Sequence, residues 1–185
     1  MSLDLLRPLG TPLPRARHDA RAFPGPLGRV PAPLVSGGAA VVVAGLGGAL
    51  TDIGPWYFAL RKPSWQPPDW AFPVAWTTIF ALAAWAGTRA WREAPTPAER
   101  RRVAWLFAAN GVLNAAWSGL FFKLRRPDWA LVEVVPLWLS VLSLVLATGR
   151  RSRFTGGLLA PYLAWVGFAA VLNLAVVRLN APFGR

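Results

Sequence analysis

The stretch Phe154–Val177, which reads FTGGLLAPYLAWVGFAAVLNLAVV, runs for 24 residues without a charged side chain. A helix of about 20 apolar residues crosses the hydrocarbon layer of a bilayer, which is roughly 30 Å thick. A helix at the surface of a soluble protein would instead keep one polar face toward water. This stretch is therefore expected to be a transmembrane helix.

Four other stretches repeat the pattern, and only the last of them contains a charged residue, Glu133. They are Val30–Thr51, Ala71–Thr88, Val103–Phe122 and Trp129–Gly149. The connections after the first loop are short, so successive helices are expected to be antiparallel neighbours. The sequence predicts an all-α integral membrane bundle of five transmembrane helices. The predicted spans are about 34–51, 72–91, 102–122, 129–148 and 155–179.

The first 33 residues differ from the rest of the chain. Residues 1–33 contain seven Pro and five Arg and little sustained apolar sequence. We expect a disordered extension, because such a segment buries too little apolar surface to fold. A transit peptide is the alternative, which proline disfavours because it opposes an amphipathic helix. The bundle domain is expected at 34–180, followed by a short tail at 181–185.

The net charge of +12 comes from basic residues that lie between the apolar stretches rather than along one soluble face. Nucleic acid is therefore not an expected partner. Arg and Lys at helix ends bias the orientation of membrane proteins. The side that holds the N-terminus carries 13 of the 20 basic residues. In a bacterial cell membrane this asymmetry predicts a cytoplasmic N-terminus.

The residue types that serve most catalytic and metal sites are scarce. The chain has no Cys, and its single His and single Met are His18 and Met1. Disulfides, thiolate chemistry and cysteine metal sites are therefore excluded, and the usual axial ligands of haem iron are missing from the spans. Glu133 has no partner carboxylate within the spans for acid–base work, and we expect a structural role for it. We predict no metal site and no required cofactor.

Aromatic and amide side chains form stripes at helical spacing on three of the predicted spans. The stripes are Trp76 and Phe80; Asn110, Asn114 and Trp117; and Tyr162, Trp165, Ala169 and Asn173. Aromatic walls with a few hydrogen-bonding groups suit a planar apolar ligand. Ordinary helix packing is the alternative interpretation. Considered by themselves, the stripes favour packing over a ligand site.

Small residues form two further stripes. Ser36, Ala40, Ala44 and Gly48 recur at a spacing of four, and Gly111, Ala115 and Gly119 do the same on the third span. Small residues allow two helix backbones to approach closely. The stripes fit either a dimer interface or packing within one chain.

The first loop, residues 52–71, combines four prolines with three Trp and one Tyr. They are Pro55, Pro63, Pro67 and Pro68, and Trp56, Tyr57, Trp65 and Trp70. Proline opposes a regular helix here. Rings with a polar edge favour the membrane interface, so the loop is expected to lie there or to fold over the mouth of the bundle.

Within this loop, residues 56–68 read WYFALRKPSWQPP. They resemble the signature WYxxLxKPxWxPP of the tryptophan-rich sensory protein family, also called translocator proteins or peripheral-type benzodiazepine receptors. Four further blocks agree with the family, and the resemblance covers about residues 37–180. The blocks are FPVAWTTIF (72–80), LNAAWSGLFF (113–122), ALVEVVPLW (130–138) and LAPYLAWVGFAAVLNLAVVRLN (159–180).

The resemblance implies a five-helix bundle, commonly a homodimer, with a cavity under the first loop. In the family this cavity binds protoporphyrin, haem and synthetic benzodiazepine-type ligands. Carried over by motif, the ligand-binding residues are Trp76, Phe80, Asn110, Leu113, Trp138, Trp165, Phe168 and Ala169. Trp56 and Trp65 belong to the lid, where we expect Arg61 and Lys62 to meet the propionates of a porphyrin. Because the spans lack His and Cys, a haem is expected to bind without axial ligation.

The resemblance leaves three functions open. The first is a multi-pass membrane receptor or sensor for porphyrins, involved in tetrapyrrole regulation or trafficking. The second is light- and oxygen-dependent porphyrin breakdown, in which Trp76 and Trp165 would be the reactive residues. The third is transport of a porphyrin or another small molecule.

Two positions depart from the animal members of the family. Leu174 stands where their sterol motif has a Tyr, and such motifs are weak predictors, so we do not expect motif-driven sterol binding. Ala115 stands where they place a cavity Trp, so the pocket is expected to be roomier there.

Overall fold

The structure, a computed structural model, describes residue 45 and residues 47–184. The N-terminal extension and most of the predicted first span, with Ser36, Ala40 and Ala44, lie outside the described residues. The described elements are α2 (Pro55–Ala59), α3 (Ala71–Glu93), α4 (Pro97–Ser118), the π-helical turn η2 (Gly119–Lys123), α5 (Pro127–Gly149), α6 (Arg153–Gly157) and α7 (Ala160–Asn180).

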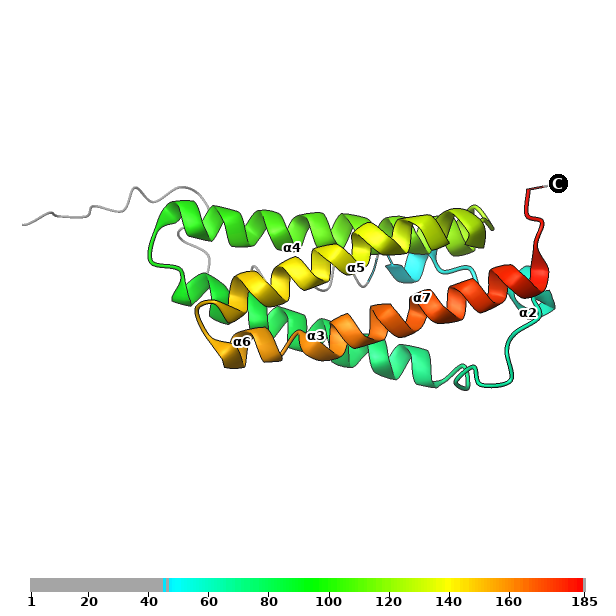
Figure 1. Cartoon of the computed structure of the whole chain (residues 1–185), viewed down its shortest axis with the longest axis horizontal. Coiled ribbons are helices and arrows are strands. Elements are labelled where there is room, and N and C mark those ends of the chain that lie inside the picture. Colours follow the sequence, from blue (N-terminus) through cyan, green and yellow to red (C-terminus); the bar gives the residue numbers. More distant parts are fainter. Residues whose placement is uncertain (1–44, 46, 185) are drawn as a thin grey trace, which may run out of the picture.

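The helices α3, α4, α5 and α7 run along the long axis of one bundle (Figure 1). Helix α5 packs against both α4 and α7, and α3 contacts α4 and α7. The loop with α2 lies at the same end as the C-terminus, and the α3–α4 and α5–α6 connections lie at the opposite end. The prediction of an all-α bundle is confirmed for the part of the chain that the structure describes.

Three described helical segments are long and apolar enough to cross a bilayer: α3, α5 and the segment Arg153–Asn180 that contains α6 and α7. Helix α4 has a similar length but begins with Glu99 and three arginines, and it carries two asparagines, so it is less apolar than the other long helices. These asparagines face the interior of the bundle, where Asn110 and Asn114 are buried.

Helix α4 begins at Pro97, five residues before the predicted start of the third span. Thr96 accepts a hydrogen bond from the backbone N–H of Glu99 at 3.2 Å. This is half of a capping box, and Pro97 occupies the first helical position, where its missing N–H costs nothing. The prolines that suggested a turn therefore also mark a helix start.

The predicted fifth span is not one continuous helix. It consists of α6 and α7, with a turn at Leu158 and Leu159. Pro161 explains the break, because in a continuous helix its ring would clash with the carbonyl of Gly157 and its N–H would be missing. At the first turn of a new helix, where Pro161 lies, neither problem arises. The short helix α2 in the proline-rich loop begins at Pro55 for the same reason.

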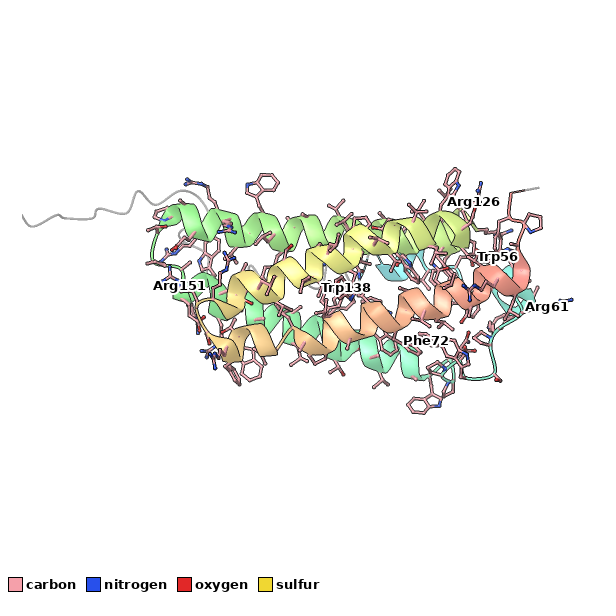
Figure 2. All side chains as sticks on the ribbon, viewed as in Figure 1. Trp56, Arg61, Phe72, Arg126, Trp138 and Arg151 are labelled. Atoms are coloured by element: carbon pink, nitrogen blue, oxygen red, sulfur yellow. The ribbon has the colours of Figure 1, made fainter. Side chains whose placement is uncertain are left out.

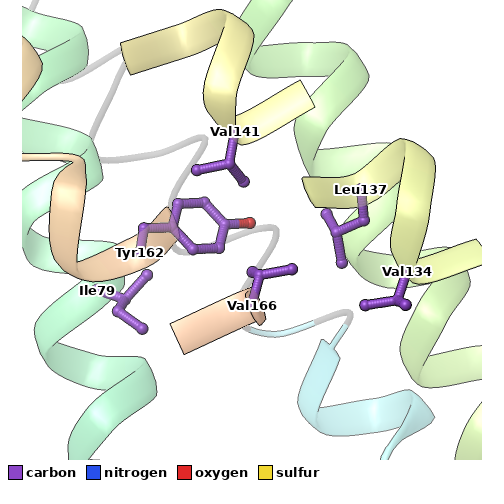
Figure 3. Close-up of a cluster of buried hydrophobic side chains, with 6 residues drawn as sticks. All are labelled: Ile79, Val134, Leu137, Val141, Tyr162 and Val166. Atoms are coloured by element: carbon purple, nitrogen blue, oxygen red, sulfur yellow. The ribbon is translucent and has the colours of Figure 1, made fainter. Parts of the chain in front are cut away.

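The main core lies between α3, α5 and α7. Figure 3 shows six buried side chains that meet there: Ile79, Val134, Leu137, Val141, Tyr162 and Val166. The three α5 residues recur at spacings of three and four, which places them on one helix face. Trp76, Leu113, Trp138 and Trp165 pack around this cluster.

Helices α5 and α6 cross at two glycines. A methyl group on Gly156 would lie 2.7 Å from the Cα of Gly149 and 2.9 Å from the carbonyl oxygen of Val145. Backbone atoms cannot move aside as a flexible side chain does, so this crossing requires a residue without a Cβ.

We therefore expect Gly156→Ala to destabilise the protein by about 1 to 3 kcal/mol, because it overpacks the crossing. The matched control is Gly157→Ala, where a methyl group meets nothing within 4 Å. Thermal unfolding in detergent, followed by circular dichroism, measures both variants. Equal unfolding temperatures for the two variants would contradict the close crossing.

Candidate functional site

A cavity of about 460 Å³ lies at the end of the bundle that carries the first loop. Its walls come from α3, from α4 with η2, from α7, from the loop, and from Gly47 and Gly48 of the preceding helical segment. The volume is within the range of about 300 to 1,000 Å³ that is typical of small-molecule sites. Helix α5 contributes no lining residue among those the structure describes.

One wall of the cavity is aromatic and comes from α3 and α7; we call Trp76, Phe80, Trp165 and Phe168 the α3–α7 wall. Trp76 stacks on Phe80 with ring centroids 5.4 Å apart and planes 25° apart. Trp165 meets Trp76 edge to face at 6.5 Å and lies 5.5 Å from Phe168. Each ring is held by its neighbours in a geometry that aromatic pairs prefer.

A second aromatic wall comes from the end of α4 and from η2; we call Trp117, Phe121 and Phe122 the α4–η2 wall. Trp117 stacks on Phe121 at 5.2 Å with planes 26° apart. Phe122 lies 4.7 Å from Phe121 and 5.7 Å from the loop residue Tyr57. All four residues line the cavity, so the cavity has aromatic side chains on two sides.

The loop supplies the charged residues of the lining, Lys62 and Asp69, together with Tyr57 and Gln66. The ammonium nitrogen of Lys62 lies 3.7 Å from the centroid of the Tyr57 ring, within the range of a cation–π contact. Burial raises the pKa of the Tyr57 hydroxyl, the charge of Asp69 raises it further, and a hydrogen bond with Gln66 lowers it. The hydroxyl is therefore neutral at physiological pH and can donate a hydrogen bond.

Behind the apolar walls, a chain of buried hydrogen bonds joins α4, α5 and α7. Asn114 donates to the Tyr162 hydroxyl at 3.1 Å, and this hydroxyl donates to Asn110 at 3.1 Å. Asn110 in turn donates to the Ser140 hydroxyl at 2.8 Å, which donates to the carbonyl of Leu137. Asn114 also lines the cavity, so this network fixes one polar group of the site.

A second amide ties α7 to α5 next to the cavity. Asn173 is 1% exposed and lines the cavity. With its amide oriented to satisfy both neighbours, it donates to the carbonyl of Pro127 at 3.1 Å and accepts from the N–H of Leu131 at 3.0 Å. These backbone groups are four residues apart in the first turns of α5, so one side chain joins two turns of the neighbouring helix.

Five of the eight residues that the family motif assigned to a ligand site line the cavity: Trp76, Phe80, Trp165, Phe168 and Ala169. The other three lie elsewhere in the described structure. Asn110 is engaged by Ser140 and Tyr162, and Leu113 and Trp138 pack against the main core. Trp138 is on α5, and its indole nitrogen packs 3.4 Å from where a Cβ on Gly167 would lie.

The predicted lid residues divide in the same way. Lys62 lines the cavity, whereas the Arg61 side chain extends away from the bundle (Figure 2). Trp65 is 48% exposed and covers Phe168, with ring centroids 6.0 Å apart. Trp56 packs edge-on against Phe121 at 6.2 Å, behind the α4–η2 wall.

Several lining residues were not predicted as site residues. Phe72 lies one turn before Trp76, and Phe121 lies one turn after Trp117, so the helical spacing already contained the signal. Tyr57, Gln66 and Asp69 come from the irregular loop, and no periodicity indicates which of its side chains face inward. Asn114, Trp117 and Asn173 belonged to the stripes but not to the residues assigned by motif.

The charged residue of the fourth span has an unusual environment. Both carboxylate oxygens of Glu133 are buried and have no hydrogen-bond partner among the described residues, and none of the arginines described there pairs with it.

The described residues also contain no group of three His, Cys, Asp or Glu side chains that could hold a metal ion.

These features define the class of protein: an all-α membrane protein with an internal cavity between aromatic walls. A family model described as the TspO/MBR family matches residues 36–179. The chain therefore belongs to the TspO/MBR family, and the resemblance that the first loop indicated is confirmed.

Individual relatives agree with the family match. A tryptophan-rich protein TspO of Chlorobaculum tepidum is 42% identical over 129 residues, which cover 68% of this chain and 80% of the relative. Protein CrtK of Rhodobacter capsulatus is 36% identical over 145 residues, 76% of this chain and 88% of the relative. The translocator protein of Sus scrofa is 38% identical over 126 residues, 68% of this chain and 75% of the relative.

The hydrogen-bond chain behind the walls predicts the effect of one deleted oxygen atom. Tyr162→Phe leaves the Asn114 donor and the Asn110 acceptor without their partner, so we expect a loss of about 1 to 2 kcal/mol in unfolding free energy. The control is Ser143→Ala, because Ser143 is exposed and bonds only the carbonyl of Leu139 on its own helix. Denaturant titration in mixed micelles measures both, and a Tyr162→Phe variant as stable as the Ser143→Ala variant would contradict the role of the network.

Proposed function

We propose that this membrane protein is a receptor or sensor that binds a porphyrin, such as protoporphyrin or haem, or a related planar hydrophobic ligand. The observation that carries the proposal is the cavity of about 460 Å³ between two aromatic walls. A relative in Cereibacter sphaeroides, 37% identical over 133 residues, is named tryptophan-rich sensory protein, which supports a sensory role.

The shape of the cavity favours a flat ligand. The stacked pair Trp76 and Phe80 presents nearly parallel rings on the α3–α7 wall, and the pair Trp117 and Phe121 does so on the α4–η2 wall. A planar ring system gains offset-stacked or edge-to-face contacts on both sides and buries apolar area, which drives its transfer from water. Recognition would then rest on shape and not on a bond to a metal.

The polar groups of the cavity would orient the ligand. Among the described lining residues Lys62 is the one cation and Asp69 the one anion. A carboxylate side chain of a porphyrin would be placed at Lys62, where a charge-assisted hydrogen bond forms. Asn114, deeper in the lining, offers an amide to a polar edge group.

Replacement of Trp165 by alanine tests the aromatic wall. We expect Trp165→Ala to raise the Kd for protoporphyrin about tenfold, which corresponds to about 1.4 kcal/mol. Quenching of the remaining tryptophan fluorescence, titrated in the dark to avoid photochemistry, gives the Kd. Trp105→Ala is the control, since Trp105 is 74% exposed on α4 and outside the lining; an unchanged Kd in Trp165→Ala would count against this site.

Neutral replacements of two neighbouring cations, Lys62 and Arg61, test the role of charge at the mouth of the cavity. Lys62→Gln should raise the Kd for the dicarboxylic porphyrin roughly threefold to tenfold and leave the Kd for its dimethyl ester unchanged. Arg61→Gln removes the same charge one residue earlier and should alter neither Kd, because its side chain is outside the lining. The contrary result is an equal loss in both variants, which would indicate a diffuse electrostatic effect of the loop.

A further inference from the structure

We infer that Asn180, the last residue of α7, is the positioning residue that turns Lys62 rather than Arg61 toward the cavity. The inference rests on the proposed function for its ligand and deepens it, because it assigns the acid selectivity of the site to a residue that does not line it. Asn180 is 119 residues away from Arg61 in the sequence.

The side-chain amide of Asn180 uses both of its N–H groups and its oxygen in hydrogen bonds. Its oxygen accepts from the backbone N–H of Arg61 at 2.8 Å, and its nitrogen donates to the backbone carbonyl of Arg61 at 2.8 Å. The second N–H of the same nitrogen is available to the carbonyl of Val176, also at 2.8 Å. Because the amide is anchored to its own helix, it holds both backbone groups of Arg61 in a fixed orientation. We call these hydrogen bonds of Asn180 the clamp on Arg61.

A fixed backbone at residue 61 determines where two successive side chains go. The backbone just before this point is in the polyproline II region, with φ −65° and ψ 134° at Leu60, where successive side chains point in directions about 120° apart. The Arg61 side chain is exposed and directed away from the bundle (Figure 2), whereas Lys62 lines the cavity. The clamp on Arg61 therefore selects which of the two cations faces the ligand.

The residue after Lys62 carries the constraint forward. Pro63 fixes its own φ and restricts the residue before it to extended conformations. Lys62 is thus held from both sides, by the clamped Arg61 and by Pro63, and its nitrogen lies over the Tyr57 ring at 3.7 Å. Loss of the hydrogen bonds from Asn180 would remove the constraint at Arg61 and leave the one at Pro63. It would remove no atom from the cavity lining.

The clamp requires an amide. Alanine removes all three hydrogen bonds. Aspartate retains an acceptor for the N–H of Arg61, but it has no donor and would direct a negative charge at the carbonyls of Arg61 and Val176. The bonds to Arg61 are exposed to solvent, so water replaces them and the fold should persist in both variants.

The first arm of the test needs no ligand, because the chain contains only two lysines, Lys62 and Lys123. Reductive methylation of the full-length protein, followed by mass spectrometry, gives the modification rate of each lysine. We expect Asn180→Ala and Asn180→Asp to accelerate modification of Lys62 at least threefold and to leave the exposed Lys123 unchanged. Leu179→Ala, an exposed neighbour on α7, is the control. An unaltered Lys62 rate in both Asn180 variants would overturn the inference.

The second arm measures the ratio of the Kd values for protoporphyrin dimethyl ester and protoporphyrin. In Asn180→Ala this ratio should fall to the value found in Lys62→Gln, while the Kd for the ester should not change. The double variant, Asn180→Ala with Lys62→Gln, should show the same ratio as Lys62→Gln alone. A wild-type ratio retained in Asn180→Ala but lost in Lys62→Gln would refute the positioning role. Failure of the wild-type protein to bind either porphyrin would refute the proposed function instead, while the methylation rates still decide whether Asn180 positions Lys62.

Discussion

The buried hydrogen bonds that run from Asn114 through Tyr162 and Asn110 to Ser140 are the constraint on which the rest of the bundle depends. In the hydrocarbon region no water is available, so each of these polar groups needs a partner inside the protein. The partners come from α4, α5 and α7, and they are satisfied together only at one relative height of the three helices. Apolar packing alone specifies that height weakly, because lipid is as apolar as the leucines and valines of the core.

This arrangement also explains where the cavity lies. Helices α4 and α7 pack against α5, and the buried face of α5 contributes Val134, Leu137 and Val141 to the core. The space that remains is at the loop end, between the α3–α7 wall and the α4–η2 wall. The loop closes this end, and Asn180 holds the loop to the end of α7. Aromatic walls and a polar mouth with one positioned cation are a suitable combination for a flat ligand with an acidic edge.

Sequence reasoning identified the apolar spans that lie within the described residues and the aromatic stripes, because both follow from composition and helical period. The family motif assigned Asn110 to the site, whereas Asn114, one turn further along the same stripe, lines the cavity. Which of the two does so depends on the level at which Ser140 meets α4. Sequence reasoning did not distinguish Arg61 from Lys62, because their orientations depend on Asn180, far away in the sequence. The early start of α4 and the break before Pro161 were readable from local capping and proline chemistry, and there the expectation of uniform spans overrode the local signal.

The most direct test of the account is a crystal structure of the protein grown from a lipid mesophase with metal-free protoporphyrin. The account predicts the ring system between Trp76 and Trp165 on one side and Trp117 on the other, with one carboxylate at Lys62 and no bond to a metal. Density for the ring on the outer surface, beside the exposed Trp85 or Trp105, with the cavity closed by its own side chains, would contradict it.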